Sequence, residues 1–207
     1  MRRHGVGVQF TRGGNISPKD VERARAGALI PIPDPLANLY LEVGDGFRFY
    51  WDSEGRHEDS ERPPFANLEF PRLDEVSIKS LEKLKWKIEW QEPVDYRFTD
   101  NPAQLRRTIL RMRKWLPILE EGNGDRFCLD TGAAGVPVVF DCHERDIEDD
   151  DRSHVVGASL LDFFTAWSRV CFQFPRSLSW PMVWKESGDD IAWASAEFRE
   201  PFRLPPQ

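Results

Sequence analysis

The sequence predicts a single α+β domain, in which a mostly antiparallel sheet of about four to six strands is flanked by helices. Three observations lead to this fold class. Apolar residues recur with helical spacing in some segments and alternate as in strands in others. Gly-rich links join neighbouring strand-like runs, as in antiparallel hairpins. The 207 residues, 40% of them hydrophobic, are enough for one domain with a substantial core.

The N-terminal part predicts two helices followed by a strand. Residues 1–16 are Gly-rich without periodicity, and we expect a loose end or a short strand there. Ser17 and Asp34 are each followed by Pro, a combination that starts helices. The second helix should end at the Gly-containing residues 44–46. Residues 47–52 then place aromatic residues at every second position, which predicts a half-buried strand.

The middle of the chain gives a less uniform pattern. Residues 53–64 are polar and end in two prolines, so we expect a loop, and 67–71 fit a short strand. Residues 72–90 fit both a helix and a strand, and we favour a helix for their first part. A further helix should start near Asn101. Its inner face would carry Leu105, Ile109, Met112 and Leu116, and Pro117 would end it.

A hairpin and a helix are predicted further on. The apolar run that starts at Trp115 breaks at Gly-Asn-Gly, residues 122–124, and a strand-like run follows at 127–129. The Gly-rich link 131–135 joins it to a second run at 136–142, which predicts an antiparallel hairpin. Residues 159–172 have the spacing of an amphipathic helix.

The order of these features resembles the SUKH superfamily of immunity proteins, relatives of the yeast cell-wall assembly regulator. The resemblance rests on a D-x-F-C-L-D strand at 125–130, a strand ending in Asp, an acidic loop and an S-L-x-D-F-F helix start at 159–164. Residues 30–51 resemble the N-terminal signature of this family, in which a Pro-started helix leads through a Gly turn into the first strand. The resemblance therefore implies a SUKH-like domain over 17–172. Residues 173–207 form a Trp- and Pro-rich extension that we expect to pack on this domain.

Composition narrows the class of protein and its partners. The net charge of −7 argues against nucleic acid as the main partner and permits a basic protein. Cys128, Cys142 and Cys171 all lie in apolar runs, which suggests reduced core thiols and a cytoplasmic protein. No apolar run approaches the roughly 20 residues of a membrane span. The basic N-terminus lacks the apolar stretch of a secretory signal, so we expect neither a membrane protein nor a secreted one.

The most charged feature is the segment 141–152, which holds seven acids and two bases. Such a run is either simply solvated or a docking surface for a basic protein. An EF-hand calcium loop would need a Gly at its sixth position, and the segment has none. Other acids lie at expected turns and read as solvated turn acids or rim contacts to a partner, with catalysis a distant third interpretation. They are Glu42, Asp45, Asp52, Glu54, Glu120, Glu121 and Asp125.

Two further patterns have weak functional interpretations. Cys128, Cys142 and His143 could suggest zinc, but only the last two are close in sequence, and adjacent strand residues point to opposite faces. A basic stripe over 107–114 on the predicted helix could touch phosphate, and more often such a stripe is solvated or pairs with the chain's own acids. We therefore expect no metal and no cofactor.

The resemblance implies a function, because SUKH proteins in bacteria are commonly immunity proteins that neutralise toxins, often nucleases or deaminases, by direct binding. It implies a non-catalytic binding protein whose partner is a basic toxin domain. The alternatives are a regulatory scaffold for an endogenous partner and, less favoured, an enzyme with a buried pair of acids. The partner contacts we expect are Tyr50, Trp51, Asp52, Asp141, Glu144, Asp146, Glu148, Asp149, Asp150 and Asp151. Trp51 could instead belong to the core.

Overall fold

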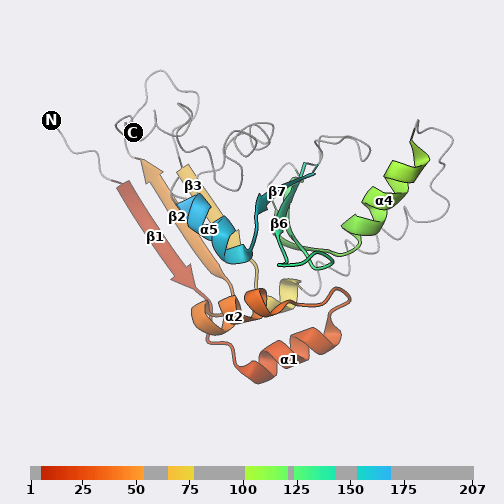
Figure 1. The fold of residues 1–207 in the computed structure, drawn as a ribbon. Helices are drawn as coiled ribbons and strands as arrows, with labels where there is room; N and C mark the ends of the chain where they lie inside the picture. Colours follow the sequence, from red (N-terminus) through yellow and green to blue (C-terminus); the bar gives the residue numbers. More distant parts are fainter. Residues whose placement is uncertain (1–5, 54–64, 77–100, 121–123, 143–152, 169–207) are drawn as a thin grey trace, which may run out of the picture.

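The computed structural model describes residues 6–53, 65–76, 101–120, 124–142 and 153–168, which form an α+β fold with two antiparallel sheets. One sheet has the order β1-β2-β3 and the other β4-β5-β6-β7 (Figure 1). The strands are β1 (Val6–Arg12), β2 (Phe47–Ser53), β3 (Phe65–Phe70), β4 (Trp115–Glu120), β5 (Arg126–Asp130), β6 (Val138–Asp141) and β7 (Ser153–Gly157). The helices are α1 (Pro18–Gly27), α2 (Asp34–Val43), α4 (Pro102–Met112) and α5 (Leu160–Ser168), and residues 73–76 are also helical. The predicted fold class is confirmed, with the strands divided between two sheets where the sequence suggested one.

The two N-terminal helices start where the sequence predicts. At α1 the Ser17 amide donates to the Asp20 carboxylate at 3.0 Å, and the Asp20 amide donates back to the Ser17 hydroxyl at 3.4 Å. This capping box satisfies two amides that the helix itself leaves unpaired. The hydrogen bond from the Ser17 hydroxyl, followed by that from its amide, lowers the pKa of Asp20. The helix α2 ends at Val43 and is followed by Gly44, whose φ of 118° favours glycine.

The three-stranded sheet has an aromatic face set by its register. Phe49 lies opposite Phe10 of β1 and Leu68 of β3, and Phe47 lies opposite Phe70. The rings of Phe47 and Phe70 stack at 4.9 Å with an interplanar angle of 3°. The strands predicted near 47–52 and 67–71 are therefore confirmed. Residues 6–12, expected to be a loose end or a short strand, form the edge strand β1.

The predicted hairpin is the centre of the four-stranded sheet. Phe127 pairs with Phe140 and Cys128 with Val139, all within the buried core. Cys128 and Cys142 are both buried in the core, as the sequence predicts. The third cysteine, Cys171, lies outside the described residues.

The prediction for Leu116 and Pro117 is wrong. The helix α4 ends at Met112, and both residues belong to β4, where Pro117 pairs with Cys128. A proline cannot donate to a sheet ladder, and the register of β4 shifts just after Pro117, at the kind of irregularity that tolerates proline. The strand β7 was also not predicted, because its five residues follow directly on the acidic segment.

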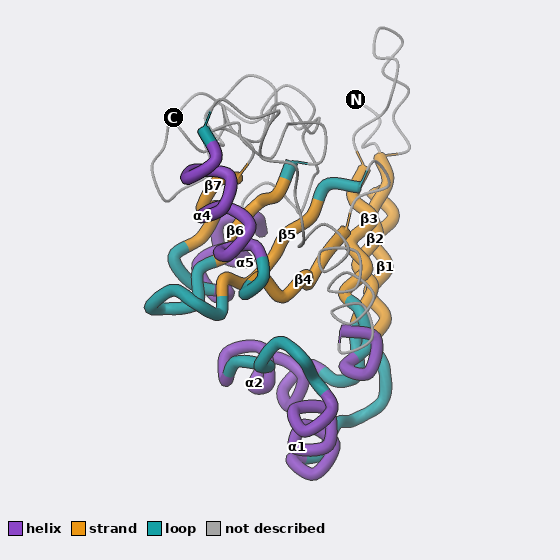
Figure 2. Tube along the Cα trace, turned by 90° about the vertical axis from the view of Figure 1, so that its right-hand side faces the viewer, coloured by secondary structure: helices purple, strands orange, loops and turns teal. Residues whose placement is uncertain are grey.

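The helix α5 connects the two sheets. It begins after Ser159, whose hydroxyl accepts the Asp162 amide at 3.1 Å, as the sequence predicts. The fully buried Phe163 ring lies 5.1 Å from Phe127 of the four-stranded sheet. The next residue, Phe164, lies 5.9 Å from Phe70 of the three-stranded sheet. Figure 2 shows the sheets side by side, with α1 and α2 at one end of both.

Some predicted features lie outside the described residues. They are most of the loop expected over 53–64, the continuation of 72–90 after its helical start, the Gly-Asn-Gly turn up to residue 123, and the last residues of the helix expected over 159–172.

The position of Phe163 predicts a large effect on stability. Phe163→Ala should lower the free energy of unfolding by about 3–5 kcal/mol, because it leaves a cavity where both sheets meet α5. Leu161→Ala on the same helix is the matched control, since Leu161 is 75% exposed, and it should change stability by less than about 0.5 kcal/mol. Urea titration followed by circular dichroism measures both, and equal effects would contradict the role of Phe163.

Candidate functional site

The predicted aromatic contacts lie near the end of β2. The side chain of Tyr50 is half-buried, and the strand continues through Trp51 and Asp52, whose side chains lie outside the described part of the structure. The backbone register places Trp51 opposite Val8 of β1 and Ala66 of β3. Their role as partner contacts remains a prediction.

The predicted acidic contacts divide into one buried residue and a segment outside the described residues. Asp141 is the last residue of β6 and only 2% exposed, so its carboxylate is not presented at the surface. Because Asp141 is buried, the predicted acidic contact surface would consist of the other six acids alone. These are Glu144, Asp146, Glu148, Asp149, Asp150 and Asp151, all within 143–152.

Both anchors of this acidic segment are well defined. Asp141 pairs with Ser153, the first residue of β7, in an antiparallel register. Paired residues of antiparallel strands have Cα atoms about 4.5–5.5 Å apart. The chain therefore leaves the sheet and returns to it at neighbouring positions, and we call residues 143–152 the acidic connection.

The two groups of predicted contacts share one end of the molecule. Figure 1 shows β2 ending, and β7 beginning, at the end away from α1 and α2. The view in Figure 2 agrees, with α1 and α2 at the opposite end from these strand termini. The structure thus brings the end of β2 and the anchors of the acidic connection to the same end, on different sheets.

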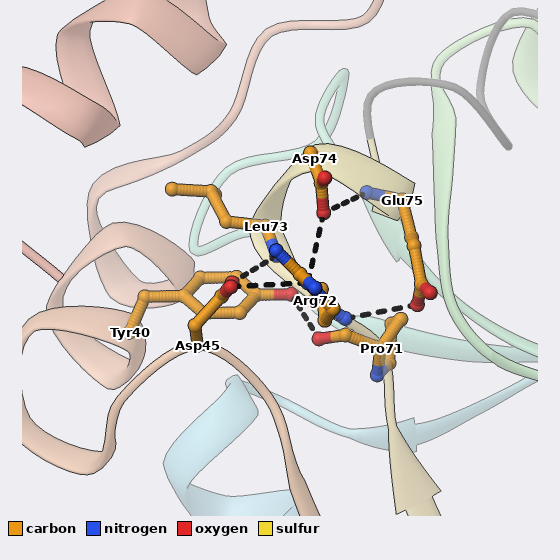
Figure 3. A network of polar contacts seen from close by, with 7 residues as sticks. All are labelled: Tyr40, Asp45, Pro71, Arg72, Leu73, Asp74 and Glu75. Atoms are coloured by element: carbon orange, nitrogen blue, oxygen red, sulfur yellow. Dashed lines mark hydrogen bonds and ion pairs between the residues drawn. The ribbon is translucent and has the colours of Figure 1, made fainter. Parts of the chain in front are cut away.

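The end next to α2 holds a polar network that joins α2, β3 and the helical residues 73–76 (Figure 3). The Asp45 carboxylate accepts the Leu73 amide at 2.9 Å and lies 3.1 Å from the Arg72 guanidinium. The buried Tyr40 hydroxyl donates to the Pro71 carbonyl at 2.9 Å. Asp45 therefore caps a helix start from a distant part of the chain, a role that the sequence does not reveal.

Burial strongly favours the neutral form of Tyr40. Desolvation, together with the nearby carboxylates of Asp45, Glu75 and Asp74, raises the pKa of the Tyr40 phenol. The hydroxyl is therefore protonated at neutral pH and can donate its hydrogen bond to the Pro71 carbonyl.

An ion pair between a half-exposed arginine and a buried aspartate explains part of the basic stripe on α4. Asp130 is 3% exposed and accepts the Arg111 guanidinium at 3.1 Å and the Gly132 amide at 3.1 Å. The same guanidinium lies 5.6 Å from the centre of the Trp115 ring. Arg111 thus ties α4 to β5, which favours the structural interpretation of the stripe over the phosphate-binding one.

The structure also bears on the expected turn acids, metal ligands and membrane spans. Asp125, expected to be a solvated turn acid, is fully buried. Among the described ranges, no group of three or more His, Cys, Asp or Glu side chains is placed to hold a metal ion. None of the helices in these ranges is both long and apolar enough to cross a membrane.

Comparison with known proteins identifies a family. The model of the SMI1/KNR4 family (SUKH-1) matches residues 15–166. The matched region runs from just before α1 into α5, so it includes both sheets except β1. No curated protein and no solved structure matches the chain.

The polar network generates a prediction about Asp45. Asp45→Ala should lower the free energy of unfolding by about 1–2 kcal/mol, because the Leu73 amide loses its cap. Glu42→Ala is the control, since this exposed acid is near the same end of α2, and it should change stability by less than about 0.5 kcal/mol. Denaturant titration measures both variants. Indistinguishable stabilities would show that the network contributes nothing.

Proposed function

Because the chain belongs to the SMI1/KNR4 (SUKH-1) family, we propose that it is an immunity protein that binds and neutralises a cognate bacterial toxin. The proposal rests on the family match over residues 15–166, since SUKH proteins of bacteria are commonly immunity proteins that act by direct binding. In this proposal the protein covers its partner and catalyses no reaction. The partner is a basic toxin domain, such as a nuclease or a deaminase.

The acidic connection supplies the proposed electrostatic contact. Six of its ten residues are acids and two are bases, so it carries a net charge of −4 out of −7 for the chain. Nucleases bind the phosphates of nucleic acid through clusters of Lys and Arg. The carboxylates of a bound protein can take the positions of those phosphates. Because both ends are fixed on adjacent strands, fewer conformations are lost on binding than for a free acidic tail.

The end of β2 supplies the proposed anchors. Interface hot spots are enriched in Tyr and Trp, which bury a large apolar area and offer a polar atom. Tyr50, Trp51 and Asp52 lie near the end of the molecule to which the acidic connection is also anchored. A toxin bound at this end would therefore meet both groups, and the polar network around Asp45 would remain outside the interface.

Co-expression tests the proposed function. The product of the neighbouring gene should inhibit growth when expressed alone, and this protein should restore growth and form a 1:1 complex with it. The complex should weaken as salt increases, because its charge contacts are screened. Failure to bind or to rescue against every neighbouring toxin would remove the proposal. Capture of an endogenous partner in its place would favour the regulatory scaffold.

A charge variant tests the acidic connection separately. Changing Asp146, Asp149 and Asp150 together to Asn should slow association with the toxin by about tenfold at low salt and leave the fold intact. The control changes the exposed Glu22, Glu42 and Glu69 to Gln, which removes the same charge from other places. Stopped-flow or surface plasmon resonance measures the association rate. An unchanged rate, or an equal loss in both variants, would mean that the connection is only solvated.

A further inference from the structure

The edge strand β1 exposes apolar side chains on the face that its neighbours bury. Val8 is 59% exposed and Phe10 is 56% exposed. Phe10 lies opposite Phe49 and its ring is 6.1 Å from that of Phe47, so it continues the aromatic row of β2 and β3. Exposed edge strands with adjacent apolar side chains invite unwanted pairing, and folded proteins normally cover them.

The helix α5 covers this face only in part. Its Phe164 lies 6.3 Å from Phe47 and 5.9 Å from Phe70, so the helix packs on β2 and β3. Figure 1 shows α5 in front of these two strands, with β1 beyond them on the side away from β7. Since α5 begins next to β7, its last residues are the ones nearer to β1.

The chain after α5 has the composition of a cover for this face. Residues 169–207 follow directly on Ser168 and contain Trp180, Trp184 and Trp193 together with several other aromatic residues. Large aromatic side chains are rarely left in water, so a Trp-rich segment needs an apolar surface to pack on. A chain extends by up to about 3.3 Å per residue, so even a small part of this segment reaches across one neighbouring strand.

The family match supports pairing these two features. It starts at residue 15 and ends at residue 166. The strand β1 and the segment 169–207 therefore both lie outside the matched residues, at opposite ends of the chain. One is a strand with exposed apolar side chains and the other is a segment rich in aromatic residues, so each could bury the apolar surface of the other.

We propose that residues 169–207 of the same chain dock on the three-stranded sheet and cover Val8 and Phe10 next to α5. The segment serves as the missing part of the layer that α5 begins. The proposed occupant of this face is thus the chain's own C-terminal segment, and neither a second copy of the chain nor the toxin. Its docking does not depend on the proposed immunity function.

Limited chymotrypsin digestion of the full-length protein tests the docking, because the enzyme cleaves after aromatic residues. In the unchanged protein, cleavage within 169–207 should be slow. The double variant Val8→Ser/Phe10→Ser should speed this cleavage by at least about tenfold, the change that corresponds to about 1.4 kcal/mol of docking free energy. Both side chains are already more than half exposed, so the variant should keep its circular dichroism spectrum. Leu161→Ser, at an exposed position of α5, is the matched control and should leave cleavage unchanged.

Four results would overturn the proposal. Rapid cleavage in the unchanged protein would show that the segment is not docked. Slow cleavage in both proteins would show that it docks elsewhere. Protection that grows with protein concentration, together with a dimer mass in light scattering, would identify a second copy as the occupant. Protection of β1 amides from hydrogen exchange only in the toxin complex would assign the face to the toxin.

Discussion

The packing of α5 against both sheets is the constraint on which the rest of the structure depends. Each sheet has an apolar face that packs toward α5 and must be removed from water, and neither sheet closes on itself. The four-stranded sheet is also buried on its other side, where Cys128 and Val139 cluster with Met112 and Trp115. Consecutive residues of a helix point in directions about 100° apart, so Phe163 and Phe164 can face two different surfaces. Their rings contact Phe127 and Phe70, respectively. One nine-residue helix thus places two sheets relative to each other, and Trp167 extends the contact with Phe127 along its next turn.

The two ends of the molecule differ in how their acidic residues are used. Near α2, acids are used internally, and Asp45 fixes the start of the helical residues 73–76 against the turn after α2. At the other end, β6 and β7 hold the two ends of the acidic connection, in which six of the ten residues are acids. A rigid scaffold at one end and a charged connection at the other suit a protein whose contacts are carried on loops.

The sequence predicts the features that depend on local chemistry. The helix starts at Ser17 and Ser159 are visible because a capping side chain acts within three residues of its own position. The division into two sheets is not visible, because strand pairing joins residues that are distant in sequence. The strand β4 was missed for a related reason: an apolar run that follows α4 without a break also continues the helical spacing, and only its pairing with β5 decides its structure. The burial of Asp141 could not be predicted either, because the sequence places this residue both at the end of a strand and at the start of an acidic segment, and only tertiary packing decides whether its carboxylate is exposed.

The distribution of charge bears on how the proposed complex would be oriented. The chain has 35 acids and 28 bases, and where both signs are mixed their fields cancel at distances beyond about 8 Å in physiological salt. A net charge of −7 spread evenly over the surface would attract a basic partner without preferring any face. More than half of that net charge belongs to ten residues anchored at a single pair of positions, Asp141 and Ser153. In the proposed complex the attraction would therefore be directional, and it would bring a basic groove first to the end of the molecule where Tyr50 and Trp51 are also found.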